Sequence, residues 1–423
     1  MNLRRNTLWN LAGSGLPLIA AALFIPFTLN RLGNEAFGVI TLIWALIGYF
    51  SLFDMGVGRA LTYELSKLRV ANNISEISLT LKAGLILTLV AGALGAIIMF
   101  ILAPYLATNW LKISPELQQD AMLSFKIAAI GVIPTTITSG LRGALEGLGR
   151  FAESNLNKIF LGFCMFVLPA ISIYFNGNQL WLITLYLVIA RTMVQIAATL
   201  QLRKYIFSST FGIVKDHIKP LINFGAWVTV TGIIGPLMVY GDRFFVSAVV
   251  GAALLPLYAI PQEGLQRLLM IPSALCGALL PQLSALNSQD ATAIYIKNYK
   301  HVAYVMLGIC AIAALLAHPI LSFWLSAKFA DQALPIVLIL SVGIWLNSIA
   351  LVPYTLMHAN GNPKVTALFH LLELLLYVLA LWWLTNKFGL IGAALAWVIR
   401  VFLDLVLLHF FANKLLYQNY EKA

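Results

Sequence analysis

Several stretches of this chain, each between 22 and 32 residues long, contain no Asp, Glu, Lys or Arg. Among them are residues 6–30, 83–111, 159–190, 220–241, 301–327 and 332–363. Because about 20 apolar residues in a helix cross the hydrocarbon core of a bilayer, each stretch can hold one membrane-spanning helix, and residues 159–190 can hold the best part of two. Only 10% of the 423 residues are charged, against about 25% in an ordinary soluble domain, so the chain is predicted to be a polytopic membrane protein.

Charged residues, Asn/Gly/Pro clusters and turn dipeptides divide the chain into twelve predicted spans, and the predicted fold class is therefore an all-α polytopic membrane protein. The spans are 7–30, 36–66, 82–108, 121–142, 154–175, 179–200, 220–241, 248–285, 301–325, 332–356, 365–386 and 388–412. The eighth span is too long for one straight helix and contains four prolines. It is predicted to be either a kinked helix or a span followed by a re-entrant segment.

Lys and Arg are distributed unevenly between alternate loops. If the N-terminus is inside, the inner tail and loops contain 18 of them and the outer loops contain 5. The excess of positive charge on one side predicts that both termini are cytoplasmic. Arg243 is counted among the outer residues and is expected to be an interfacial anchor. The net charge of +11 is largely a topology signal, and no nucleic-acid partner is expected because no soluble basic domain is present.

An internal repeat predicts two halves. Matching residues recur at offsets of 218, 212 and 209: Gly33 with Gly251, Gly149 with Gly361, and Arg191 with Arg400. The predicted organisation is a six-helix bundle over residues 1–203, a cytoplasmic linker over 204–219 and a second six-helix bundle over 220–423. Because six is even, the halves keep one orientation and are related by a pseudo-two-fold axis along the membrane normal, with a cavity between them.

Four segments resemble a known family: NLAGSGLPLIAAALFIPF (10–27), RLGNEAFG (31–38), GYFSLFDMGVGRAL (48–61) and GALEGLGRF (143–151). Over its whole length the chain is similar to the polysaccharide (O-antigen) flippases of the multidrug/oligosaccharidyl-lipid/polysaccharide exporter superfamily. The resemblance implies a V-shaped, alternating-access transporter of twelve helices that moves undecaprenyl-pyrophosphate-linked sugar repeat units between leaflets. It also implies coupling to a cation gradient, with H⁺ or Na⁺ as candidate ions. Membrane lipids, a polysaccharide polymerase and a chain-length regulator are the other candidate partners.

Cationic side chains inside the predicted spans suit such a cargo. An anionic pyrophosphate in a low-dielectric cavity needs fixed positive charge, and the forked guanidinium group matches phosphate oxygens. The candidate substrate-binding residues are Arg191, Arg400, Arg267, Arg59 and Lys126. A structural role stays open as the alternative. Arg191 could pair with an acid on another helix, and Lys126 could snorkel to the interface.

Acidic side chains inside the spans are candidates for ion coupling, because a buried carboxylate gains affinity for a proton. The candidates are Asp54, Glu263, Glu373 and Asp404, and Glu373 follows His370 by one helical turn. The alternative is that Glu263 with Arg267, and Arg400 with Asp404, form i,i+4 pairs that only make membrane insertion tolerable.

Catalytic chemistry is not expected. The chain has no GxxxxGK[ST] phosphate loop, and His301, His318, His358 and His409 are too scattered for a metal site, so no catalytic site, cofactor or metal is predicted. The glycine-rich stretch 140–150 is interpreted as close helix packing followed by a helix C-terminal turn. Two other functions remain open. One is a cation-coupled multidrug or metabolite antiporter of the same superfamily, and the other is a membrane-embedded glycosyltransferase or polymerase, for which the longest outer connection (109–120) leaves little room.

Overall fold

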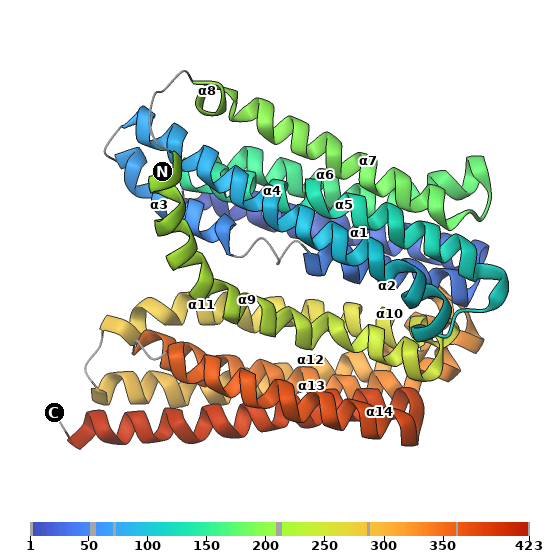
Figure 1. The fold of residues 1–423 in the computed structure, drawn as a ribbon. Helices are drawn as coiled ribbons and strands as arrows, with labels where there is room; N and C mark the ends of the chain where they lie inside the picture. Colours follow the sequence, from blue (N-terminus) through green and yellow to red (C-terminus); the bar gives the residue numbers. More distant parts are fainter. Residues whose placement is uncertain are drawn as a thin grey trace. The chain divides into compact units, whose positions relative to one another are not determined.

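The computed structural model describes residues 3–50, 56–70, 73–208, 214–285, 288–360 and 363–421. Every secondary-structure element in these residues is helical, which confirms the all-α prediction (Figure 1). The chain divides into two compact units, Met1–Gly241 and Asp242–Ala423, and each is described by itself.

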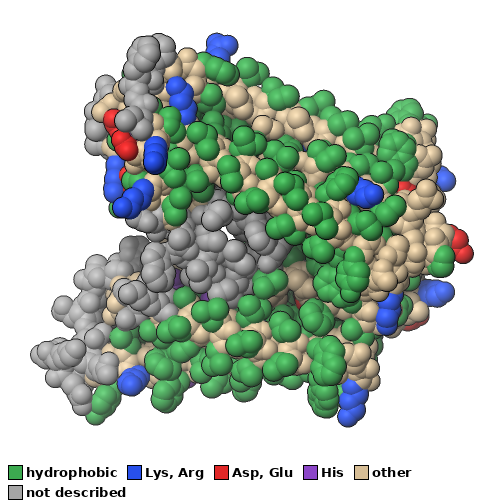
Figure 2. All heavy atoms as spheres, in the orientation of Figure 1, with side chains coloured by type: hydrophobic (Ala, Val, Ile, Leu, Met, Phe, Trp, Pro, Cys, Tyr) green, Lys and Arg blue, Asp and Glu red, His purple; other side chains and the backbone are tan. Residues whose placement is uncertain are grey.

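Eight helical segments of the described residues are long and apolar enough to cross a membrane. They are Gly15–Leu46, Ile74–Trp110, Pro115–Gly147, Phe151–Asn176, Leu180–Gln201, Thr292–Trp324, Ala327–Ala359 and Val365–Tyr417. Their outer surfaces carry large apolar side chains, as helices that face lipid require; Ile101, for example, is 70% exposed. Hydrophobic side chains cover the helices along their length, and most of the charged side chains in view lie near helix ends (Figure 2). A multi-pass membrane protein is thus confirmed, whereas the count of twelve helices and their pseudo-two-fold relation stay predictions.

The first unit is built around the long helix α5. Its elements are α1 (Leu3–Leu32), α2 (Asn34–Phe50), α3 (Val57–Val70), α4 (Ile74–Tyr105) with a π-helical turn (Leu106–Trp110), α5 (Pro115–Gly147), α6 (Phe151–Asn176), α7 (Leu180–Gln201), the short α8 (Arg203–Ile206) and most of α9 (Val214–Val250). Helix α5 packs against α3, α4 and α7, while α6 packs against α1 and α7.

The second unit is built around α13. After the end of α9 it contains a 3₁₀ turn (Ala252–Leu254), α10 (Leu255–Gln266), a second 3₁₀ turn (Arg267–Leu269), α11 (Met270–Ala285), α12 (Ser288–Trp324), α13 (Ala327–Ala359) and α14 (Pro363–Glu421). Helix α13 packs against α10, α11, α12 and α14. The predicted eighth span is interrupted by the 3₁₀ turn at Arg267–Leu269, and α14 is broken at Gly389, whose φ is 58°.

Positive backbone φ angles mark three of the four glycines that define the predicted internal repeat. Gly33 has φ 80° and Gly251 has φ 93°, a conformation that only glycine adopts without strain. Each follows the end of a long helix, α1 and α9 respectively. The third repeat glycine, Gly149, has φ 76°, and its partner Gly361 lies outside the described residues.

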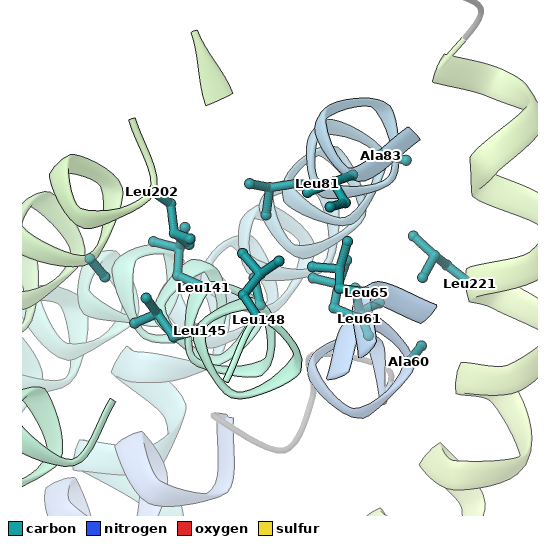
Figure 3. Close-up of a cluster of buried hydrophobic side chains, with 14 residues drawn as sticks. Ala60, Leu61, Leu65, Leu81, Ala83, Leu141, Leu145, Leu148, Leu202 and Leu221 are labelled. Carbon is teal, nitrogen blue, oxygen red and sulfur yellow. The ribbon is translucent and has the colours of Figure 1, made fainter. Parts of the chain in front are cut away.

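A leucine cluster joins four helices of the first unit at one end. It contains Leu61 and Leu65 of α3, Leu81 of α4, Leu141 and Leu145 of α5, and Leu221 of α9, all fully buried (Figure 3). Two described residues of the predicted linker, Tyr205 and His217, also contact α4. Ser78 Oγ donates to the Tyr205 carbonyl oxygen at 2.7 Å, and Thr80 Oγ1 lies 3.1 Å from His217 Nδ1.

Close backbone contact holds α5 against α3. The hydroxyl of Thr62 donates to the carbonyl oxygens of Gly58 and Gly143, both at 3.0 Å. A Cβ atom on Gly143 would collide with the Gly58 carbonyl group. At the end of α5, Arg150 N donates to Leu145 O at 2.7 Å, which closes the helix around the positive-φ Gly149. The interpretation of residues 140–150 as close packing and a C-terminal turn is therefore confirmed.

We expect Gly143→Ala to lower stability by about 1–3 kcal/mol, because the added methyl group overpacks the α3–α5 contact. The measurement is the temperature at which the purified protein loses its monodisperse elution profile in detergent. Gly308→Ala on α12 is the matched control, since no atom lies within 4 Å of the Cβ position there and alanine favours a helix by about 1 kcal/mol. Equal stability of both variants would show that α3 and α5 are not in close contact.

Candidate functional site

A cavity of about 260 Å³ with several polar and cationic side chains in its lining lies in the first unit, between α5, α6 and α7. It is lined by Thr135, Thr138, Ser139, Arg142, Ser154, Asn157, Lys158, Leu161, Gly162, Met165, Arg191 and Ala198. The residues of α5 recur at i, i+3, i+4 and i+7, and those of α6 recur in the same way, so each helix turns one stripe toward the cavity. Among the described lining residues three side chains are cationic and none is acidic.

Arg191 is the innermost cation of this cavity by burial. It is half-buried on α7, whereas Arg142 and Lys158 are exposed. Among the described residues none forms a hydrogen bond or an ion pair with its guanidinium group, so pairing with an acid on another helix is not observed there. Thr184, two helical turns before Arg191 on α7, is fully buried and donates to the Leu180 carbonyl oxygen.

Among the described contacts, Glu146 is the acid that lies closest to a cation of the cavity lining. Its Oε1 accepts a hydrogen bond from Ser154 Oγ at 3.0 Å and lies 3.8 Å from Arg142 Nε, a long contact between exposed groups. Beside it, Arg150 binds Glu153 through two nitrogens at 2.8 and 2.6 Å.

The other candidate cations of the first unit do not line this cavity. Arg59 is exposed on α3. The Lys126 ammonium lies 5.6 Å from the centre of the Phe100 ring. Arg142 and Lys158 do line the cavity, although the sequence analysis counted them only among the cytoplasmic charges. The polar residues near them on the same helices, Thr138 on α5 and Asn157 on α6, are the signal that would have identified them.

A chain of ion pairs links α9 to α10 in the second unit. Arg243 Nη2 donates to Glu263 Oε1 at 2.8 Å, and Arg267 Nη2 contacts Glu263 Oε2 at 3.3 Å. Arg243 is only 1% exposed and lies within α9, so the expectation of an interfacial anchor in an outer loop is wrong. The predicted i,i+4 pairing of Glu263 with Arg267 is present, but Arg243 is the more buried of the two arginines that bind Glu263.

Asp242 is a buried acid that the sequence interpretation missed. Its Oδ2 accepts hydrogen bonds from Tyr258 Oη and Gln262 Nε2, both at 2.7 Å, and from Tyr377 Oη at 3.4 Å. The donors come from α10 and α14. Only the i,i+4 spacing of Tyr258 and Gln262 was visible in the sequence.

A second acidic group in this unit joins two segments of α14. His370, Glu373 and Asp404 place their ligand atoms within 4.8 Å of one another, and His370 Nε2 lies 3.9 Å from Asp404 Oδ1. Glu373 is 1% exposed, and no donor in the described part of the chain binds its carboxylate oxygens. Such a group can share a proton or hold a cation.

Arg400 lies close to this group in sequence but has an aromatic environment. It is 8% exposed, and its guanidinium carbon lies 5.9 Å from the centre of the Tyr377 ring and 6.0 Å from that of Trp397. The prediction that Arg191 and Arg400 face a common cavity stays a prediction. Asp54, the remaining candidate for ion coupling, lies outside the described residues.

We expect Glu263→Gln to destabilise the protein by about 3 kcal/mol, because it removes the carboxylate that compensates the buried Arg243. Arg267→Gln is the matched control and is expected to cost less than about 1 kcal/mol, since that side chain is 49% exposed. Thermal unfolding of both variants in the same detergent measures the difference. If the two variants are equally stable, Arg243 does not depend on Glu263.

Solved structures with a similar fold are transporters. The chain superimposes with a TM-score of 0.81 on a structure described as the inward-facing conformation of a multidrug resistance MATE family transporter of the MOP superfamily, at 15% identity and with 99% of this chain and 96% of that chain covered. A second is a MOP superfamily transporter from Pyrococcus furiosus whose binding pocket is described as having reverse polarity; its TM-score is 0.65 at 14% identity, covering 98% and 95% of the two chains. At these identities the likeness shows the fold alone.

Sequence comparison establishes the family. Residues 3–287 match the model of a family described as "Polysaccharide biosynthesis protein". A protein of Shigella flexneri named "Putative O-antigen transporter" is 32% identical over 426 aligned residues, covering 99% of this chain and 100% of the relative. Together with the MOP superfamily fold, these matches confirm the resemblance inferred from the glycine- and proline-containing segments. The chain therefore belongs to the polysaccharide biosynthesis protein family.

Proposed function

We propose that this protein translocates an undecaprenyl-pyrophosphate-linked oligosaccharide repeat unit across the bacterial inner membrane, for O-antigen or other surface polysaccharide synthesis. The observation that carries the proposal is Arg191, a guanidinium that lines a cavity inside an apolar helix bundle and binds no described acid. A cation in the membrane interior is costly, and an anionic substrate is a reason to keep it there. The name of the Shigella flexneri relative supports a polysaccharide precursor as the cargo.

The proposed mechanism is alternating access between two six-helix bundles. In this proposal α2 and α3 form one span, α10 and α11 form another, and α14 contributes two spans on either side of Gly389, which gives twelve. Both termini are cytoplasmic, as the Lys and Arg distribution suggests. A polysaccharide polymerase and a chain-length regulator would take over the cargo at the outer leaflet.

A cation-coupled multidrug antiporter is the second candidate, and the fold of the MATE structures favours it. A site for cationic drugs needs net negative charge. The cavity of the first unit has three cations and no acid in its lining, which favours an anionic cargo.

We expect deletion of the gene to cause complete, unpolymerised lipid-linked repeat units to accumulate on the inner leaflet. Wild-type protein should restore polymer at the cell surface, whereas Arg191→Ala and Arg400→Ala should not, because each removes a cation proposed to bind the pyrophosphate. Polymer display and lipid-linked intermediates are measured together, with protein amount in the membrane checked.

The control for this experiment is Lys204→Ala, which removes an exposed charge on α8 that does not line the cavity. Full display from an Arg191→Ala/Arg400→Ala double variant would reject the role of both arginines. A normal lipid profile in the deletion strain, with altered drug sensitivity, would favour the antiporter instead.

Ion coupling is assigned in this proposal to Glu373 and Asp404. Two neighbouring carboxylates repel when both are ionised, and one H⁺ or Na⁺ bound between them removes that repulsion. Glu263 is left with a structural role because two arginines already compensate it.

We expect the thermal stability of the purified protein to rise when Na⁺ replaces K⁺ or when the pH is lowered, because a ligand that binds only the folded state stabilises it. Glu373→Gln and Asp404→Asn should abolish this dependence, while Glu116→Gln, an exposed acid at the start of α5, should retain it. Stability that responds equally in all variants would place the coupling ion elsewhere.

A further inference from the structure

A groove of about 710 Å³ lies on the second unit, where the first turns of α12 meet the last turns of α14. Tyr299 of α12 forms one wall, and the rest of the described lining belongs to α14. The groove shares no described residue with the cavity of the first unit or with the acidic group at Glu373 and Asp404. It is therefore a separate feature of the protein, on a surface that the proposed function does not use.

The lining of the groove changes from apolar to polar along α14. Val406, Phe410, Lys414 and Tyr417 fall at positions i, i+4, i+8 and i+11, which form one stripe of a helix. Val406 and Phe410 are large exposed apolar side chains, and Asn413 and Lys414 follow one turn later. At 1.5 Å per residue, Lys414 lies about 12 Å beyond Val406 along the helix. An apolar stretch with a cationic end matches an amphiphile that has a hydrocarbon chain and an anionic headgroup.

His409 holds the wall between the two helices. Its Nδ1 lies 3.4 Å from Tyr295 Oη, and its Nε2 lies 3.0 Å from the amide nitrogen of Asn413. The centre of its ring lies 5.1 Å from that of Tyr299. Because both ring nitrogens have partners inside the protein, His409 contributes a fixed aromatic surface, and the groove is formed before a ligand binds.

The charge of the groove favours an anion. Lys414 is exposed, no acid is among the described lining residues, and no described acidic side chain forms an ion pair with this lysine. Lys297 and Lys300, which are also exposed, lie within two residues of Tyr299 on α12. This end of the unit thus carries positive charge on both helices that form the groove.

We infer that the groove binds an anionic glycerophospholipid of the surrounding membrane, with its phosphate at Lys414 and an acyl chain against Val406 and Phe410. Lysines and aromatic rings gather where a membrane helix leaves the hydrocarbon, and basic pockets between such helices bind anionic headgroups. Helix α14 ends at Glu421, seven residues after Lys414, so this lysine is at the depth of the headgroups. The inference does not rest on the proposed function, because it concerns the surface that faces the membrane.

The size of the groove distinguishes a lipid from a free anion. Its 710 Å³ is within the roughly 300–1,000 Å³ of sites that enclose a drug-sized molecule. This volume admits a headgroup together with the upper part of an acyl chain. An inorganic phosphate ion would reach Lys414 but would leave the apolar part of the groove empty.

The test is a lipid titration of the full-length protein in detergent, read by native mass spectrometry, which resolves each bound lipid. The probes are phosphatidylglycerol and phosphatidylcholine with the same oleoyl chains. Wild type should bind phosphatidylglycerol about tenfold more tightly, because the choline ammonium cancels the charge of the phosphate and repels Lys414. Lys414→Gln should lower the affinity for phosphatidylglycerol to that for phosphatidylcholine. Phe410→Ala should weaken both lipids severalfold, because it removes part of the apolar wall.

Two variants outside the groove are the matched controls. Lys328→Gln removes an exposed charge at the start of α13, and Phe402→Ala removes an exposed ring from α14 two turns before Phe410. Both should bind the two lipids as wild type does. The four altered side chains are all exposed, so each variant should fold normally, which thermal unfolding without added lipid checks.

Several results would overturn the inference. They are equal affinity of wild type for the two lipids, unchanged phosphatidylglycerol binding by Lys414→Gln, and competition by glycerol 3-phosphate at the same concentration, which would indicate a site for a free anion. Displacement of phosphatidylglycerol by a lower concentration of farnesyl pyrophosphate would assign the groove to the lipid carrier instead. None of these results depends on the lipid-linked intermediates of the deletion strain, so the groove and the flippase function can fail separately.

Discussion

The free energy needed to bury a charged side chain restricts where apolar helices can place Lys, Arg, Asp and Glu. At the α9–α10 contact of the second unit this cost is met by pairing: Glu263 lies between Arg243 and Arg267, and Asp242 accepts hydrogen bonds from three side chains. In the first unit Arg191 is instead placed beside a polar cavity. A cation that opens onto a cavity keeps its binding capacity for a ligand, whereas a cation in a salt bridge has already used it.

Helix α5 shows how the first unit holds such a cavity open. On one face, Gly143 and Gly147 allow backbone contact with Gly58 and Thr62 of α3, where any larger side chain would collide. Its other stripe, from Thr135 to Arg142, faces α6 and α7 across the cavity. The close contact with α3 fixes α5 rigidly, so the polar stripe does not need to pack tightly to keep the helix in position.

The sequence predicted the helical fold, and it singled out Arg191 as a candidate binding residue, because both depend on local composition; the predicted place of Arg191 in a cavity between two halves stays a prediction. Long uncharged runs indicate helices, and an arginine without an acid one turn away stands out in such a run. The position of Arg243 was misjudged because it directly follows the uncharged run 220–241, which suggested a helix end, whereas α9 continues to Val250. Whether an arginine next to such a run is paired depends on a neighbouring helix.

A single sequence does not show which side chains of distant helices contact one another. Asp242 and Tyr377 are 135 residues apart, and only the packing of α14 beside α9 and α10 brings them together. The same holds for the cavity, whose three cations come from three helices. The helical spacing of Thr138, Ser139 and Arg142 was visible in the sequence, but the fact that this stripe faces Arg191 was not.

The repeat positions Arg191 and Arg400 show how the two units can share a scaffold and differ in chemistry. Four residues after Arg191 the chain has Gln195, while four residues after Arg400 it has Asp404. Arg400 is buried between Tyr377 and Trp397, and its helix also carries the acids Glu373 and Asp404 beside His370. If both arginines served only to neutralise an acid within the membrane, both would need one nearby, and Arg191 has none among the described residues. The difference is explained if Arg191 is kept for an anionic ligand, while the acids beside Arg400 are kept for a proton or another cation, so that the two repeat positions have separate roles.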